Sequence, residues 1–82
     1  MYETYTVTIT YYEPGNDLPM TTTGSSNRLA NAVRAACIGI DSSWAAGVDV
    51  HERLSKNSYS LSEEKFHELL KRSSPSISSV IR

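Results

Sequence analysis

The stretch YTVTITYY, residues 5–12, alternates larger apolar side chains with threonine at a period of two. This period predicts a β-strand over residues 2–13, because successive side chains of a strand point to opposite faces of the sheet. One face of this strand would carry Tyr5, Val7, Ile9 and Tyr11 toward a core. The other face would carry threonine at each even position from 4 to 10, and we expect it to lie against water or another protein.

The residues after this strand predict a turn. EPGND, residues 13–17, combines proline, which fixes φ, with glycine, which supplies a positive φ. The following segment LPMTTTG, residues 18–24, is either a weaker hairpin strand or a loop. Pro19 would confine such a strand to an edge of the sheet, or would lie at its start.

The next segment, residues 25–41, has the apolar spacing of an amphipathic helix. Its apolar stripe comprises Leu29, Ala32, Val33, Ala36, Cys37 and Ile40. We expect Ser25 or Ser26 to accept the free N–H groups at the start of this helix. Gly39 is expected to end it in a left-handed conformation.

The middle of the chain carries the only tryptophan, Trp44, in a segment expected to be a loop or a short helical turn (41–47). Residues 48–55 then resume the period of two, with valine on one face and polar residues on the other. Residues 59–62 are expected to return as a short strand after a tight turn.

A second helix is predicted over residues 62–72, with Ser62 as its N-cap. Leu61 and Phe66 have the spacing of a hydrophobic staple, which fixes how the chain enters a helix. The final residues, 73–82, are compatible with an edge strand or with a short helix that has Pro75 at its first position.

This order of elements predicts one domain over residues 1–82, of the α+β class. We expect a two-layer sandwich, in which an antiparallel sheet carries both helices on one face and leaves the other face bare. If residues 18–24 are a loop and the tail is a strand, the order becomes β-α-β-β-α-β, which is the ferredoxin-like arrangement.

The composition limits the classes of function. The chain of 82 residues has a net charge of −1, which disfavours broad binding to the phosphates of a nucleic acid. Its single cysteine excludes an intrachain disulfide and is typical of a reducing compartment, so we expect a cytoplasmic protein. The sequence shows neither a signal peptide nor an apolar run of membrane-spanning length, and no membrane partner is expected.

No cofactor, metal or catalytic site is predicted. Cys37 lies within the apolar stripe of the first helix, where a free cysteine acts as a small hydrophobic residue. A minimal hydrolase or nuclease that uses His51 with Asp49 or Glu52 remains one alternative. The other alternative is a small module that binds single-stranded nucleic acid, with Tyr2 and Tyr12 stacking on bases.

The strand-first opening MYETYTVTIT with the helix NRLANAVRAAC behind it resembles, in architecture, the small phage-encoded inhibitors of host defence known as anti-CRISPR proteins. This resemblance implies a stoichiometric inhibitor that blocks a surface of a host nuclease or surveillance complex in the host cytoplasm. It transfers no binding residues to this chain. The nearly balanced charge departs from the nucleic-acid mimics among such inhibitors and favours the plugging of a protein surface.

We therefore expect a non-enzymatic module whose partner is another protein. An edge of the sheet is a further candidate, either for strand addition to a partner or for a homodimer. The candidate contact residues are those with distinctive shape or charge. They are Tyr2, Tyr12, Glu13, Asn16, Asp17, Arg28, Arg34, Trp44 and Arg53.

Overall fold

The computed structural model describes residues 3–73, so Tyr2 and the tail from residue 74 onward lie outside the described residues. The strands are β1 (Tyr5–Tyr11), β2 (Met20–Ser26), β3 (Ala45–Glu52) and β4 (Ser58–Ser60), and the helices are α1 (Leu29–Ala36), the 3₁₀ turn η1 (Ser42–Trp44) and α2 (Glu63–Arg72). None of the helices between residues 3 and 73 is long and apolar enough to cross a membrane.

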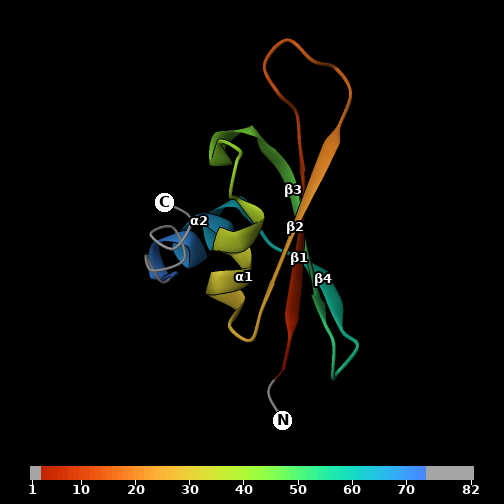
Figure 1. Cartoon of the computed structure of the whole chain (residues 1–82), viewed down its shortest axis with the longest axis vertical. Coiled ribbons are helices and arrows are strands. Elements are labelled where there is room, and N and C mark those ends of the chain that lie inside the picture. Colours follow the sequence, from red (N-terminus) through yellow and green to blue (C-terminus); the bar gives the residue numbers. More distant parts are fainter. Residues whose placement is uncertain (1–2, 74–82) are drawn as a thin grey trace.

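The four strands form one antiparallel sheet in the order β2-β1-β3-β4. Both helices lie on the same side of this sheet, which Figure 1 shows edge-on. The predicted α+β sandwich is therefore confirmed. The ferredoxin-like alternative is wrong, because it needed residues 18–24 to be a loop, whereas β2 pairs with β1 along its whole length.

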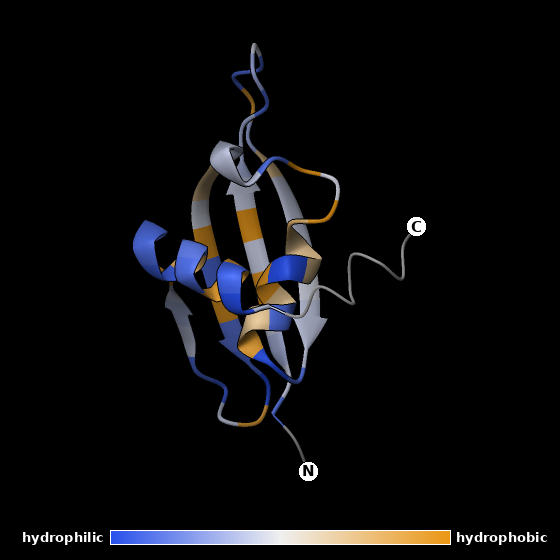
Figure 2. Ribbon diagram, turned by 90° about the vertical axis from the view of Figure 1, so that its left-hand side faces the viewer, coloured by the Kyte–Doolittle hydropathy of each residue, from blue (hydrophilic) through white to orange (hydrophobic). Residues whose placement is uncertain are grey.

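The core lies between the helices and the side chains that one face of the sheet presents to them. Figure 2 looks onto the helix side and shows the apolar bands of the strands behind the helices. The buried apolar residues are Val7, Ile9, Tyr11, Val48 and Val50 from the sheet, Ala32, Val33 and Ala36 from α1, and Phe66 and Leu69 from α2. The odd-numbered residues of β1, from Tyr5 to Tyr11, therefore face the helices, as predicted.

The opposite face of the sheet is polar, and no element between residues 3 and 73 covers it, as predicted from the threonine row. Thr6, Thr8 and Thr10 of β1 are partly exposed, and their partners on β2 are exposed threonines and a serine. The hydroxyl oxygens of Thr6 and Ser25 lie 3.1 Å apart across the strands. We call this surface the hydroxyl face. On β3 and β4 it continues with Gly47, Asp49, His51, Ser58 and Ser60.

The start of α1 differs from the prediction. Ser25 and Ser26 belong to β2, and the residue that precedes the helix, Arg28, makes no side-chain capping bond. The hydroxyl of Ser26 accepts the N–H of Arg28 at 3.3 Å, one residue before the helix, so it does not cap the first turn. Gly39 is left-handed as predicted, with a φ of 87°, but α1 already ends at Ala36 with Cys37 as its C-cap, so the helix is shorter than predicted.

The cap of α2 is also as predicted. The hydroxyl of Ser62 accepts the backbone N–H of Lys65 at 3.1 Å. Glu63 and Glu64 in the first turn and Lys71 and Arg72 in the last turn match the helix dipole.

Gly24 allows α1 to lie directly on β2. A Cβ atom at this position would lie 2.3 Å from the backbone N of Ala36 and 2.7 Å from the backbone O of Ala32. Real Cβ atoms do not approach backbone atoms so closely, so any side chain at position 24 would push the helix away from the sheet.

Substitution of Gly24 is therefore expected to destabilise the domain. The Gly24→Ala variant should lose about 1 to 3 kcal/mol of unfolding free energy, because it overpacks the contact between α1 and β2. Denaturant unfolding measures this loss. Gly47 is a matched control, since it also lies in a strand but a Cβ there would meet nothing within 4 Å. Equal effects of Gly24→Ala and Gly47→Ala would contradict the close contact.

Candidate functional site

The candidate contact residues do not form one patch. Tyr12, Glu13, Asn16 and Asp17 lie in the connection between β1 and β2, and the N–H of Tyr12 donates to the carbonyl oxygen of Trp44 at 3.3 Å. These five residues therefore share one end of the molecule.

The predicted arginines lie elsewhere. Arg28 follows β2 and Arg53 follows β3, at the end of the sheet opposite to the β1–β2 connection. Arg34 lies in α1, where its Nε donates to the hydroxyl of Ser73. Only the group in the β1–β2 connection is thus brought together, with Trp44 at its base.

This connection projects beyond the body of the domain. Figures 1 and 2 show it as a long loop that extends past the other elements at one end of the sheet. We call residues 12–20 the hairpin tip.

The sequence of the hairpin tip explains its shape. The N–H of Asn16 donates to the carbonyl oxygen of Glu13 at 3.0 Å, which closes a four-residue turn. Pro14 occupies the second position of this turn, and Gly15 occupies the third with a φ of 81°. This is the pattern of a type II turn, which requires a positive φ at its third position.

A second local bond orders the residue that follows the turn. The side-chain oxygen of Asn16 accepts the backbone N–H of Leu18 at 3.0 Å, as in an Asx turn. Pro19 then fixes the φ of the residue that leads into β2. Leu18 is therefore held in place by local interactions, although its side chain makes no part of the core.

The hairpin tip combines apolar and acidic side chains. Leu18 is 72% exposed, Tyr12 43% and Met20 39%, and these are half of the exposed large apolar residues in the described chain. The charged residues of the tip are Glu13 and Asp17, and the segment contains neither lysine nor arginine. The tip thus presents an exposed leucine, Leu18, close in sequence to the carboxylates of Glu13 and Asp17.

Sequence reasoning missed Leu18 and Met20 as contact candidates, because both belonged to the expected second strand, where apolar residues pack inward. The available signal was the position of Leu18 between Asp17 and Pro19, inside turn-forming residues rather than in an alternating run.

Trp44 supports the base of the hairpin. Its ring stacks on that of Tyr11, with centroids 6.4 Å apart and an interplanar angle of 22°. It is half-buried and packs against the core cluster. Trp44, one of the candidate contact residues, therefore packs at the base of the hairpin tip.

A shallow hollow of about 340 Å³ lies on the hydroxyl face. The hydroxyl of Ser60 donates to Asp49 Oδ1 at 2.7 Å, and Nδ1 of His51 lies 2.9 Å from the hydroxyl of Ser58. Glu52 points to the other face, where it accepts the hydroxyl of Tyr59. Neither carboxylate expected to assist His51 is hydrogen-bonded to it, so this geometry does not form a histidine–carboxylate pair.

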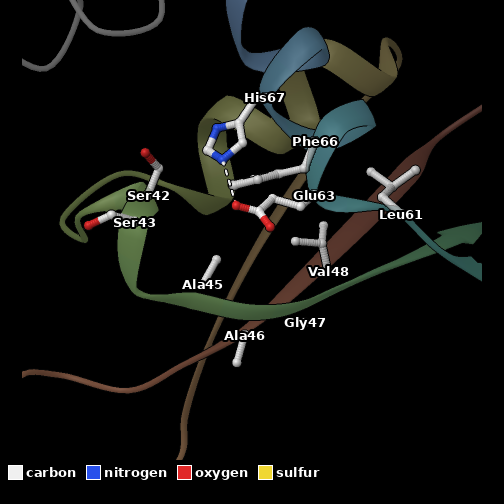
Figure 3. A pocket seen from close by; sticks show the side chains of 10 residues that line it. All are labelled: Ser42, Ser43, Ala45, Ala46, Gly47, Val48, Leu61, Glu63, Phe66 and His67. Carbon is white, nitrogen blue, oxygen red and sulfur yellow. Dashed lines mark ion pairs between the residues drawn. The ribbon is translucent and has the colours of Figure 1, made fainter.

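A second pocket, of about 150 Å³, lies between η1, β3 and the start of α2 (Figure 3). Ser42 and Ser43 come from η1, and Nε2 of His67 lies 3.9 Å from Oε1 of Glu63 on α2. Its volume is smaller than that of typical cofactor pockets. Within residues 3–73, no three histidine, cysteine or acidic side chains are grouped as metal ligands.

Cys37 is not activated as a nucleophile. Burial raises the pKa of its thiol to about 11, although the nearby positive charge of Arg34 acts in the opposite direction. The thiol is therefore protonated at neutral pH, and the thiolate is the reactive form.

The chain was compared with protein-family models, with curated proteins and with solved structures, and none of the three comparisons finds a match.

We expect Cys37 to react slowly with alkylating reagents in the folded protein. At mildly alkaline pH, alkylation should be roughly tenfold or more slower than in the urea-unfolded chain, because the raised pKa lowers the thiolate fraction. Mass spectrometry of time points measures both rates. Equal rates in the two states would contradict the burial of this thiol.

The Asn16→Ala variant should loosen the hairpin tip without unfolding the domain. The backbone N–H of Leu18 loses its acceptor, so its amide hydrogen should exchange faster with solvent. The amides of Val7 and Ile9 in β1 serve as the internal reference and should keep their protection. Unchanged exchange at Leu18 would show that the Asx turn does not order the tip.

Proposed function

We propose that this chain is a non-enzymatic protein-binding module whose hairpin tip inserts into a groove of another protein. The observation that carries this proposal is Leu18, a largely exposed apolar residue that follows a type II turn and whose backbone N–H is bonded in an Asx turn. An isolated exposed leucine is ordinary, but one displayed on a projecting and locally ordered loop suits an interface anchor.

The energetics favour the tip as the centre of an interface. Burial of one leucine side chain stabilises a complex by roughly 2 kcal/mol, and less of this is lost to ordering because the loop is already in place. Tyr12 and Met20 add side chains of the types that are enriched in interface cores.

The hydroxyl face is less suited to that role. Those of its hydroxyls that bond to water would need a new partner when water is removed, and an unmatched group costs free energy. On the four strands this face carries no aromatic residue, methionine or arginine. It is better suited to the polar rim of an interface than to its core.

The charge of the tip specifies the kind of partner. Glu13 and Asp17 would be attracted to a groove with a basic rim, and the same carboxylates would be repelled by the phosphates of a nucleic acid. Basic grooves are common on proteins that bind nucleic acids. This supports a stoichiometric inhibitor of the anti-CRISPR type, which would block a host nuclease or surveillance complex in the host cytoplasm.

The test compares two exposed leucines at opposite ends of the domain. Leu54 is 49% exposed, and its backbone N–H is also held in a turn, by Oε1 of Glu3 at 2.6 Å. A tagged wild-type chain first recovers its partner from host cells. Leu18→Ala should then weaken binding to the purified partner by roughly tenfold or more, measured by calorimetry, whereas Leu54→Ala should leave it unchanged.

Both variants should melt at the wild-type temperature, because neither leucine belongs to the core. Equal affinity of the Leu18→Ala and wild-type chains for the recovered protein would refute the hairpin tip as the anchor. Recovery of nucleic acid alone, with affinity that falls steeply as salt is added, would refute protein binding itself.

A further inference from the structure

β2 is an edge strand of the described sheet, since only β1 pairs with it. The direction of its free backbone groups follows from the bonds of β1. The carbonyl of Thr4, just before β1, accepts the N–H of Arg53, which follows β3. The even-numbered residues of β1 therefore direct their backbone N–H and C=O groups toward β3, and the odd-numbered residues direct theirs toward β2. The partners of the odd residues are Ser26, Gly24, Thr22 and Met20. The alternate residues Thr21, Thr23 and Ser25 therefore direct their N–H and C=O groups outward.

This edge lacks the features that usually prevent strand pairing. Residues 20–26 contain no charged residue and no proline, and their register with β1 has no bulge. Thr21, Thr23 and Ser25 are all exposed. The other edge, β4, is only three residues long. β2 is thus the longer and less protected edge of the described sheet.

We propose that β2 pairs with β2 of a second copy of this chain, antiparallel and centred on Thr23. In this register Thr23 lies opposite Thr23, and Thr21 lies opposite Ser25 in both directions. Every outward residue then meets another outward residue, and the pairing forms about six backbone hydrogen bonds between the chains. A self-complementary edge of this kind makes the same contacts from both sides, as a two-fold dimer requires.

The side chains agree with a second copy as the occupant. The pairing brings threonine against threonine or serine on the hydroxyl face, and such pairs stabilise antiparallel strands. The domain already contains one contact of this type, between Thr6 and Ser25 at 3.1 Å. All residues of the edge are neutral and the chain has a net charge of only −1, so two copies do not repel each other.

α1 lies over the covered face of β2 at Gly24, while Thr21, Thr23 and Ser25 of the edge are exposed. Because the paired strands are antiparallel, the two hairpin tips of the dimer would point in opposite directions. The dimer interface shares only Met20, the first residue of β2, with the surface proposed for the partner protein, so the two proposals are tested by different variants.

The test uses the full chain and two matched proline substitutions. Thr23→Pro removes an outward N–H from β2 without touching its bonds to β1. Ser60→Pro does the same at the other edge, because Leu61 and Asn57 bond to β3 and the residues at 58 and 60 point outward. Sedimentation velocity over a wide range of concentrations should show a dimer for the wild type and for Ser60→Pro, and a monomer for Thr23→Pro.

Amide hydrogen exchange provides the second readout. In the dimer, the amides of Thr21, Thr23 and Ser25 should gain protection as concentration rises, whereas those of Thr22 and Gly24 should be protected at every concentration. A wild-type chain that stays monomeric would overturn the proposal. So would a dimer that survives Thr23→Pro, or protection of Thr23 that does not depend on concentration.

Discussion

The close contact between α1 and β2 at Gly24 is the constraint on which the rest of the structure depends. A helix backbone that touches a strand backbone needs small residues on both sides, and this contact has glycine on the strand and alanines on the helix. It fixes α1 on one face of the sheet, and α2 packs beside it on the same face. A chain of this length has few apolar residues to spare, and within residues 3–73 the core lies on that face.

One-sided packing leaves three surfaces with different chemistry. The hydroxyl face is polar and hydrogen-bonds with itself across strands, as between Asp49 and Ser60. The β2 edge is neutral and offers backbone groups. The hairpin tip is apolar and acidic, and its order comes from local turns rather than from the core. The hairpin tip and the β2 edge share only Met20, where β2 begins.

The sequence alone predicts the elements whose pattern is local. The alternation of residues 5–11 and the staple and cap around Ser62 correctly predict β1 and α2. The cap of α1 was predicted wrongly, because Ser25 has a stronger role as a strand residue opposite Thr6, and that pairing depends on residues far away in the sequence.

In the candidate site, too, features that depend on local sequence were predicted and features that depend on distant pairing were not. Glu13, Asn16 and Asp17 were singled out for their shape or charge, and they lie in a turn that was itself predicted from EPGND. Leu18 was not, because its exposure depends on where the strand begins and on the bond from Asn16. The distance that separates Arg28 and Arg53 from the tip follows from the register of the sheet, which no local pattern reveals.

The central claim is that the core occupies one face of the sheet and leaves the other bare. Paramagnetic relaxation by a soluble nitroxide tests it directly on side-chain methyl groups. The methyls of Thr8 and Thr23 should relax strongly, whereas those of Val7 and Ile9 in the same sheet should be shielded. Shielding of the threonine methyls in the monomer, equal to that of Val7 and Ile9, would contradict the account.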